Sequence, residues 1–434
     1  MSKTYVELRE YLNQVPVIET HSHYFMSTDT QPVDVFELAI SSYSKSDLQT
    51  VSREAVADVE QIIMDKEKPF DQRFKCFEKY YAASMHTAYN KSVLRGLAEC
   101  WGIQSFDKEA LLELSERIGK RDNDFYNRML EKYKLKIKII DPCDPNLIAR
   151  FADSGGKLKG YSPDCRFAFS LPGYHWWNQG NIAKMLARQT GMKIENLDDL
   201  IRAFEQHLKK CIDAGIVCVK DQCAYSRILR FDITDRSLAD QLFARLQNGD
   251  ALSEDESLAL SNWLMRQYME LARKYNIPVQ IHTGHMAGLY NEISKTNAVH
   301  LTSLIADYSD VQFDLFHGNW PYMGEYLFLG KNYPNVSLDL CWVQQIDPEY
   351  SIELIKRAIM TVPHNKLLAF GGDDSMIEHV IGYLCIARDN VAAALSALVD
   401  KGWLSLAHAR AICCDMFFNN PNKVFKLGFD EVYI

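Results

Sequence analysis

Eight short apolar segments, rich in β-branched and aromatic residues, recur along the chain. Most are separated by stretches with helical periodicity, such as 196–214, 252–275 and 348–361. This alternation is typical of a parallel sheet, whose strands are buried on both faces and read as continuous apolar runs. The predicted strands are VPVIET, KIKIID, RFAFSL, GIVCVK, PVQIHT, VQFDLF, VSLDLC and KLLAFGG, ending at Thr20, Asp141, Leu171, Lys220, Thr283, Phe316, Cys341 and Gly372.

The strand count and the polar residues at strand ends favour a closed barrel over an open, doubly wound sheet. In a barrel the carboxyl ends of all strands converge on one face, whereas the outer strands of an open sheet usually lie apart. We therefore predict an α/β fold, a distorted (β/α)8 TIM barrel formed as a single domain over residues 1–434. Residues 33–130 are expected to form a helical insertion that caps the barrel after strand 1, and residues 375–434 to form C-terminal helices.

Composition argues against several classes of function. The formal net charge is −9 and no dense basic run occurs, which disfavours a nucleic-acid partner. No apolar run reaches the roughly 18–20 residues of a membrane-spanning helix, and residues 1–11 do not read as a secretory signal. Eleven scattered cysteines without a C-x-x-C pair fit reduced thiols. We expect a cytoplasmic protein with a small-molecule substrate and no nucleic-acid or membrane partner, which can form a homo-oligomer.

Histidine and aspartate residues stand at the ends of four predicted strands. His21 and His23 in ETHSHYF lie two residues apart, so both imidazoles point to the same side of an extended chain. His282 in QIHTGH lies at the tip of the fifth strand, His317 in FDLFHGNWPY follows the sixth, and Asp373 in AFGGDDS follows the eighth. Each residue alone could be an ordinary loop or core side chain. Their recurrence at converging strand ends predicts one metal centre.

Further candidates follow the same strands. Lys220 ends the fourth strand and could form an ion pair or bind a substrate carboxylate. Arg227 in KDQCAYSR is the best candidate for an anionic substrate group, since a guanidinium can pair with a carboxylate through two hydrogen bonds. Asp374 would replace Asp373 as a ligand after a one-residue shift in register. The expected lining of a pocket for a polar substrate is Tyr225, His285, Trp320 and Trp177.

The order of these motifs resembles the amidohydrolase superfamily over nearly the whole chain. QIHTG, FDLFHGNWPY, PNVSLDLCW and AFGGDDS resemble the amidohydrolase-related metal-dependent hydrolases, a group that also contains decarboxylases. FARLQNGDALSEDESLA, the long insertion and FFNNPNKVF resemble uronate isomerases, although the His-Gly-Asn-Trp run after strand six departs from their pattern. The resemblance implies that the metal is bound by His21, His23, His282 and Asp373. It also implies that His317 binds the metal or polarises the substrate.

The resemblance leads us to expect a metal-dependent hydrolase. A metal-activated water would attack an amide, ester or lactone carbonyl of a small, polar, anionic substrate. Asp373 would be the general base, and His317 would stabilise the oxyanion. We expect one divalent ion, zinc or else manganese, cobalt or iron. Some relatives carry a carboxylated lysine at the position of Lys220, which would bridge a second ion.

Other functions remain open from the sequence. The alternative is an aldose-ketose isomerase of a sugar acid, similar to uronate isomerases, and a further alternative is a metal-dependent decarboxylase. A non-catalytic metal-binding or scaffold protein would require the strand-end residues to have converged by accident. Production of a ketose from D-glucuronate and D-galacturonate would distinguish the isomerase from the hydrolase.

Overall fold

The strands form one parallel sheet in chain order. The computed structural model of the protein describes residues 2–23, 33–157 and 162–434. Each strand pairs in parallel with the next, from β1 to β8. Their bounds are β1 Val17–Ser22, β2 Leu135–Ile140, β3 Cys165–Ser170, β4 Ile216–Asp221, β5 Val279–Ile281, β6 Phe313–Leu315, β7 Val336–Asp339 and β8 Leu367–Leu368. All eight predicted strands are confirmed.

Backbone hydrogen bonds join the first strand to the segment after the last. The N–H of Thr20 donates to the carbonyl of Phe370 (2.9 Å), and the N–H of Asp373 donates to the carbonyl of His21 (3.1 Å). The second bond continues the pairing beyond Thr20, so His21 lies within β1 rather than after it. The sheet therefore closes into the predicted barrel and places the residues after β8 beside the end of β1.

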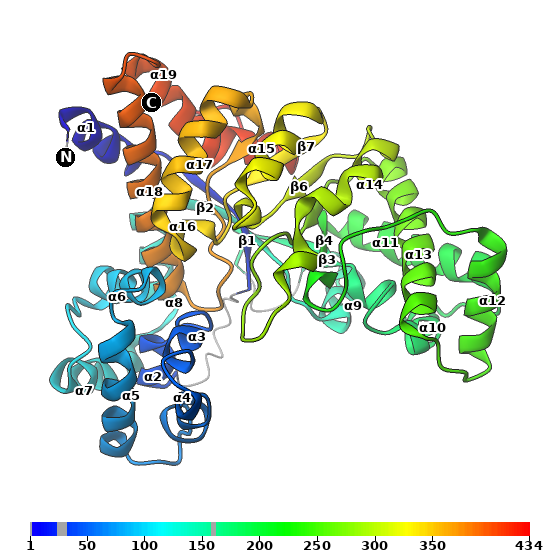
Figure 1. Ribbon diagram of the computed structural model, residues 1–434, viewed down its shortest axis with the longest axis horizontal. Helices are drawn as coiled ribbons and strands as arrows, with labels where there is room; N and C mark the ends of the chain where they lie inside the picture. The colour runs from blue at the N-terminus through cyan, green and yellow to red at the C-terminus, as the bar shows by residue number, and fades with distance from the viewer. Residues whose placement is uncertain (1, 24–32, 158–161) are drawn as a thin grey trace.

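Helices surround the barrel and follow most of its strands (Figure 1). α17 Pro348–Thr361 has the bounds predicted from periodicity, and α11 Leu197–Ala214 starts after the predicted Asn196, whose side chain accepts a hydrogen bond from Asp199 N. Asn196 caps this helix because its oxygen satisfies a backbone N–H that has no partner within the helix. The other helices between strands are α9 Pro145–Asp153, α10 Ile182–Thr190, α12 Arg236–Gln247, α13 Glu254–Tyr275, α14 Thr302–Asp307, α15 Met323–Asn332 and α16 Val343–Ile346.

Between β1 and β2, the described residues 33–134 contain seven α-helices, drawn in blue to cyan in Figure 1. Its aromatic residues pack against one another, as in Phe36, Phe74 and Phe77, which are buried. This is the region where periodicity predicted a helical insertion. The helices are α2 Val35–Ala39, α3 Ser44–Gln49, α4 Arg53–Asp58, α5 Phe70–Ser84, α6 Ala88–Trp101, α7 Lys108–Arg117 and α8 Asn123–Lys132.

The ends of the chain lie close together. α1 Lys3–Leu12 packs against α18 Ile377–Asp400 and α19 Leu406–Cys414, and the chain ends beyond α20 Asn420–Val424 (Figure 1). α18 is long and apolar enough to cross a membrane, with a mean hydropathy of 1.2, but 78% of its most apolar window is buried in the fold. It packs against α1, α6 and α17, so its apolar side chains form part of the protein core.

The insertion meets α18 at a backbone contact between two glycines. A Cβ on Gly96 of α6 would lie 2.0 Å from the carbonyl oxygen of Glu378, and a Cβ on Gly382 would lie 2.1 Å from that of Ser92. Both distances are far below van der Waals contact, so the two helices can pack this closely only without side chains at these positions.

We therefore expect Gly96→Ala to lower the free energy of unfolding by about 3 kcal/mol, at the upper end of the usual cost of overpacking. Urea denaturation followed by circular dichroism measures this change. Gly119→Ala is the matched control, because nothing lies within 4 Å of a Cβ at that position. Equal unfolding midpoints for the two variants would contradict this description of the contact.

Candidate metal centre

The barrel brings the five predicted strand-end residues into one buried cluster. Asp373 Oδ1 lies 3.3 Å from His21 Nε2 and 3.0 Å from His23 Nε2. Its other oxygen, Oδ2, lies 3.8 Å from His317 Nε2. His282 joins through its Nδ1, which lies 3.1 Å from His317 Nε2. Four imidazoles and one carboxylate, from β1 and from the segments after β5, β6 and β8, thus meet at the carboxyl end of the barrel.

Backbone carbonyls fix the tautomers of three of these histidines. His23 Nδ1 lies 2.8 Å from the carbonyl oxygen of Asp141, and His317 Nδ1 lies 3.0 Å from that of Cys341. His282 Nε2 lies 2.7 Å from the carbonyl oxygen of His285. Because a carbonyl oxygen only accepts, each of these nitrogens carries the hydrogen and donates it. The other nitrogen of each neutral ring therefore presents a lone pair to the cluster.

Burial keeps most of the cluster's imidazoles neutral. It lowers the pKa of His21 to about 4 and that of His317 to about 3, and it holds the pKa of His282 well below its usual range. Burial alone would raise the pKa of Asp373, but hydrogen bonds with His21 and His23 hold it well below the usual value. His23 differs: burial lowers its pKa, but the hydrogen bond with Asp373 raises it well above normal. At neutral pH and without a cation, His282 and His317 therefore present lone pairs, and the His23 imidazolium pairs with the Asp373 carboxylate, from which a bound cation would displace the proton.

This donor set fits a divalent cation. The lone pairs of His282 Nδ1 and His317 Nε2 face each other at 3.1 Å, an arrangement that is repulsive unless a cation lies beside them. Ligand atoms at about 2.0–2.2 Å from one ion lie roughly 3 Å apart, which matches the separations in the cluster. Metal-binding histidines usually donate their other N–H to a carbonyl or carboxylate, as three of these do. His21 Nδ1, moreover, is buried without a hydrogen-bond partner among the described residues.

Asp373 is held in an uncommon backbone conformation. Its φ of +55° lies in the left-handed region, which costs energy for a residue with a Cβ. The hydroxyl of Tyr43, from the insertion, donates to the carbonyl of Asp373, and the backbone N–H of Asp373 bonds to β1. The insertion therefore helps to fix the residue at the centre of the cluster.

The neighbouring Asp374 points away from the cluster. Its carboxylate lies 3.0 Å from His379 Nδ1 and accepts a hydrogen bond from Tyr383 (3.1 Å), both on α18. His379 Nε2 donates in turn to the carbonyl of Leu38 in the insertion (2.9 Å). Because these partners occupy Asp374, the register of the loop places Asp373, not Asp374, in the cluster.

An aromatic wall borders the cluster. The Trp342 ring lies 5.0 Å from His317 and 4.9 Å from His285, measured between ring centroids, and it stacks near Tyr43. Its φ of +62° is uncommon for a bulky residue, and its side chain is fully buried. Sequence reasoning did not single out Trp342 or Tyr43. The strand-end position of Trp342 in PNVSLDLCW was an available signal, whereas nothing local marked Tyr43.

The predicted substrate-side residues divide into two groups. The Tyr225 ring lies 4.9 Å from that of His282, and Trp320 lies 5.2 Å from His285, between centroids, so these side chains border the cluster. Trp177, which is 44% exposed, donates its indole N–H to Ser226 instead (3.2 Å).

Arg227 is occupied by protein groups. Its guanidinium donates to the side chains of Ser261 and Asn262 and to the carbonyls of Arg230 and Ile228, and only 2% of the residue is exposed. A guanidinium has five N–H groups, and four protein acceptors engage them here. This arrangement leaves Arg227 poorly placed to bind a substrate anion. The sequence could not predict this outcome, because these neighbours are brought together only by the fold.

Lys220 lies beneath the cluster. It is 2% exposed, and its positive charge contributes to lowering the pKa of His21, His282 and His317 after the larger effect of burial. Its Nζ lies 4.3 Å from the centroid of the Phe316 ring. The first of its predicted roles, an ion pair, does not occur with any residue in the described ranges.

A second group of possible ligands lies away from the first. His175 Nε2 lies 2.6 Å from Asp221 Oδ2, with the Cys223 thiol nearby, and all three are buried. His175 Nδ1 lies 2.7 Å from Ser261 Oγ. Both ring nitrogens therefore have partners, and burial raises the pKa of Cys223 well above normal, which keeps it a thiol. We interpret this group as a buried ion pair.

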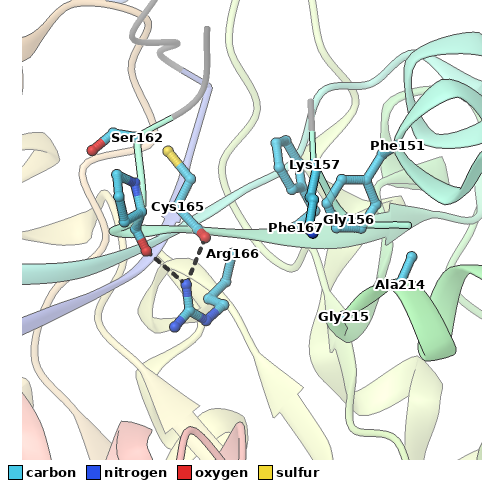
Figure 2. Close-up of a pocket in the computed structure, with 10 residues that line it drawn as sticks. Phe151, Gly156, Lys157, Ser162, Cys165, Arg166, Phe167, Ala214 and Gly215 are labelled. Atoms are coloured by element: carbon cyan, nitrogen blue, oxygen red, sulfur yellow. Dashed lines mark hydrogen bonds between the residues drawn. The ribbon is translucent and has the colours of Figure 1, made fainter. Parts of the chain in front are cut away.

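Figure 2 shows a hollow far from these residues, with a volume of about 490 Å³. It lies where β3 begins, at Cys165, and beside Ala214 and Gly215, just before β4. Arg166 turns its guanidinium toward the carbonyls of Pro163 and Cys165 (Figure 2). The hollow therefore lies at the amino ends of these strands. Because the active sites of barrel enzymes lie at the carboxyl ends, we assign this hollow no catalytic role.

Two family models match the chain. The amidohydrolase model matches residues 231–426, and the glucuronate isomerase model matches residues 157–298. The first match contains His282, His317 and Asp373, and the second contains Lys220 and His282.

Curated relatives resemble only part of the chain. The protein fluG of Emericella nidulans is 30% identical over 228 residues, which is 50% of this chain and 26% of that protein. A uronate isomerase of Caulobacter vibrioides is 22% identical over 260 residues, or 56% of this chain and 52% of the isomerase. The chain thus spans about half or less of the length of these relatives.

Solved structures resemble the whole chain in fold. A uronate isomerase from Thermotoga maritima superposes with a TM-score of 0.79 at 14% identity, covering 98% of both chains. A protein assigned as a metal-dependent hydrolase from Lactobacillus casei superposes with a TM-score of 0.65 at 15% identity, covering 97% of both. At such identities the likeness establishes the barrel architecture.

Proposed function

We propose that the chain is a metal-dependent hydrolase of small polar carbonyl compounds, built on an amidohydrolase-superfamily barrel that is also similar to uronate isomerases. The observation that carries this proposal is the pair of inward-facing lone pairs on His282 and His317 together with the Asp373 carboxylate, which the His23 imidazole also contacts. Imidazole and carboxylate ligands suit zinc, and also manganese, cobalt or iron. When bound, such an ion supplies Lewis-acid chemistry, polarising a carbonyl and lowering the pKa of water.

Asp373 is the proton carrier in this proposal. Its Oδ1 is engaged by His21 and His23, while its Oδ2 is turned toward His317 at a longer distance of 3.8 Å. Because its low pKa keeps it ionised, Oδ2 can accept a proton from an attacking water and return it to the leaving group. The hydrogen bonds behind the loop hold this oxygen in place.

The geometry changes the role we assign to His317. The sequence led us to expect an oxyanion stabiliser, which requires an N–H directed at the substrate. In the structure the N–H is on Nδ1 and donates to Cys341, so Nε2 presents a lone pair toward His282 and Asp373. We therefore assign His317 to the metal-binding set. Cys341, although close enough to join it, is held as a thiol because burial raises its pKa well above normal.

Isomerisation of a sugar acid is the second candidate. The glucuronate isomerase match spans residues 157–298, which include Lys220, Tyr225 and the loops on the substrate side of the cluster. The amidohydrolase match spans three of the five cluster residues, and this favours hydrolysis as the chemistry. The two matches overlap only at residues 231–298.

Turnover assays with the zinc-, manganese- and cobalt-loaded protein test the proposal. An amide, ester and lactone library is screened for acid release, and D-glucuronate and D-galacturonate are screened in parallel for ketose. We expect hydrolysis that is lost in His23→Ala, with no ketose formed. Ketose formation that is lost in the same variant would replace the hydrolase with an isomerase, and release of carbon dioxide would indicate a decarboxylase.

A further inference from the structure

Lys220 is 2% exposed, and its ammonium group lies over the Phe316 ring. No hydrogen bond or ion pair joins that ammonium group to a residue within 2–23, 33–157 or 162–434. Lys138, another buried lysine, contrasts with it, because its Nζ lies 2.7 Å from Asp164 Oδ2. Burying an ammonium is costly unless an anion or several acceptors compensate for the lost water. Among the described residues, the ammonium of Lys220 therefore has room for a hydrogen-bonded anion such as a ligand would supply.

The ammonium lies beside the metal-binding cluster. Phe316, whose ring centroid is 4.3 Å from Lys220 Nζ, immediately precedes His317 and also contacts the ring of His21 (4.9 Å between centroids). Lys220 is the penultimate residue of β4, so it is directed from the barrel wall toward the same end as the cluster. An anion bound to it would lie close to a substrate carbonyl at the cluster.

The surroundings of Lys220 favour an ammonium over a carboxylated lysine. The face of an aromatic ring attracts a cation and repels an anion, and Phe316 presents its face to Nζ. The carboxyl groups of Asp314 and Asp339, both fully buried inside the barrel, lie close enough to interact electrostatically with each other and with Lys220. A carbamate would add a further negative charge beside this pair.

Arg227, the other basic residue predicted to meet an anionic substrate, has partners already. The Arg227 guanidinium is occupied by Ser261, Asn262 and two backbone carbonyls, as described above. Of the two basic residues predicted to meet an anionic substrate, Lys220 is therefore the available one.

We propose that Lys220 stays an ammonium and binds a carboxylate of the substrate beside the reacting carbonyl. This inference rests on the proposed function and narrows its substrates to small carboxylic acids that also carry an amide, ester or lactone group. A charge-assisted hydrogen bond between the two groups supplies the anion that the buried ammonium lacks.

Binding of succinamate to the zinc-loaded protein, measured by isothermal titration calorimetry, tests the subsite. Succinamate carries one carboxylate and one amide, and succinamide is its neutral counterpart. We expect Lys220→Met to weaken succinamate binding by at least about tenfold, as expected for loss of a charge-assisted contact, and to change succinamide binding less than about twofold. Lys401→Met, which removes an exposed lysine, is the matched control and should leave succinamate binding unchanged.

Two outcomes would overturn the proposal. One is equal affinity for succinamate in the wild type and in Lys220→Met. The other is loss of a second metal equivalent in Lys220→Met, together with a carbamate signal from the wild type in ¹³C NMR after equilibration with ¹³C-bicarbonate. Lys220→Gln provides a second variant if Lys220→Met folds poorly. Because binding is measured without turnover, a protein that binds succinamate through Lys220 but hydrolyses nothing would refute only the proposed reaction.

Discussion

Replacing Asp373 with asparagine is expected to lower kcat/KM for hydrolysis by roughly 10³- to 10⁴-fold, because the change removes both a metal-binding charge and the proton acceptor. Asparagine keeps the size of the side chain and tolerates the left-handed backbone at φ +55°, so the loop should retain its shape. Steady-state kinetics together with elemental analysis of the variant would separate loss of metal from loss of proton transfer.

Asp430→Asn is the control for this variant, because it removes one carboxylate from an exposed position far along the C-terminal segment. Its kcat/KM should equal that of the wild type. Retention of more than about a tenth of the wild-type rate by Asp373→Asn would exclude Asp373 as the general base, since such a base contributes roughly 10²-fold or more.

His175→Leu should be among the most destabilising single changes in the barrel. His175 and Asp221 form a 2.6 Å pair in which neither side chain is exposed. Burial alone would raise the pKa of Asp221, but His175 lowers it to about 2. Removing the imidazole strands a buried carboxylate, at a cost of about 3–5 kcal/mol in the free energy of unfolding. Chemical denaturation at pH 7 measures this cost.

The pair also supports the metal centre, because the backbone carbonyl of Asp221 accepts the N–H of His282 (2.9 Å). We therefore expect His175→Leu to weaken metal binding as well. The exposed His408, changed to leucine, is the control for the loss of a histidine. If His175→Leu lowered the free energy of unfolding by less than about 1 kcal/mol, the loss of His175 would not leave Asp221 as an unpaired buried carboxylate, and this account of the pair would be wrong.

The barrel and its cluster were predictable because both depend on local patterns. Apolar runs mark the buried strands, and the parallel topology then carries the residues at their carboxyl ends to one face. His21, His23, His282, His317 and Asp373 are far apart in the sequence, yet each is identified by its position relative to a strand. The strand ends themselves differ from the prediction by one or two residues for β1 to β7 and by four for β8. At His21 the difference arises because pairing across the closure extends β1.

The supporting contacts could not be predicted, because they join distant segments with no local mark. His379 looked like an ordinary helical histidine, yet it connects the loop after β8 to Leu38 in the insertion. Tyr43 reaches the carbonyl of Asp373 from the same insertion.

The charged residues show the same limit. Arg227 and Lys220 are both basic in the sequence, but tertiary neighbours accept hydrogen bonds from Arg227, whereas the described residues offer the Lys220 ammonium only an aromatic ring. Whether a basic residue can bind a substrate anion therefore depends on its neighbours in the fold, which the sequence does not show.

The two family matches cover different parts of the site. The amidohydrolase match covers most of the residues that would hold the ion, and the glucuronate isomerase match covers the β4 side, where Lys220 lies. We therefore expect the barrel common to both families to supply the cation site, and the residues along β4 and its loop to select the substrate.

Anomalous diffraction from crystals of the zinc-loaded protein, recorded on both sides of the zinc edge, tests the central claim most directly. We predict one strong peak about 2.0–2.2 Å from His23 Nε2 and an Asp373 carboxylate oxygen, with His21, His282 and His317 around it. A peak at His175, Asp221 and Cys223 in place of this one, or no peak in the cluster of fully loaded protein, would contradict the claim that these strand ends form a metal centre.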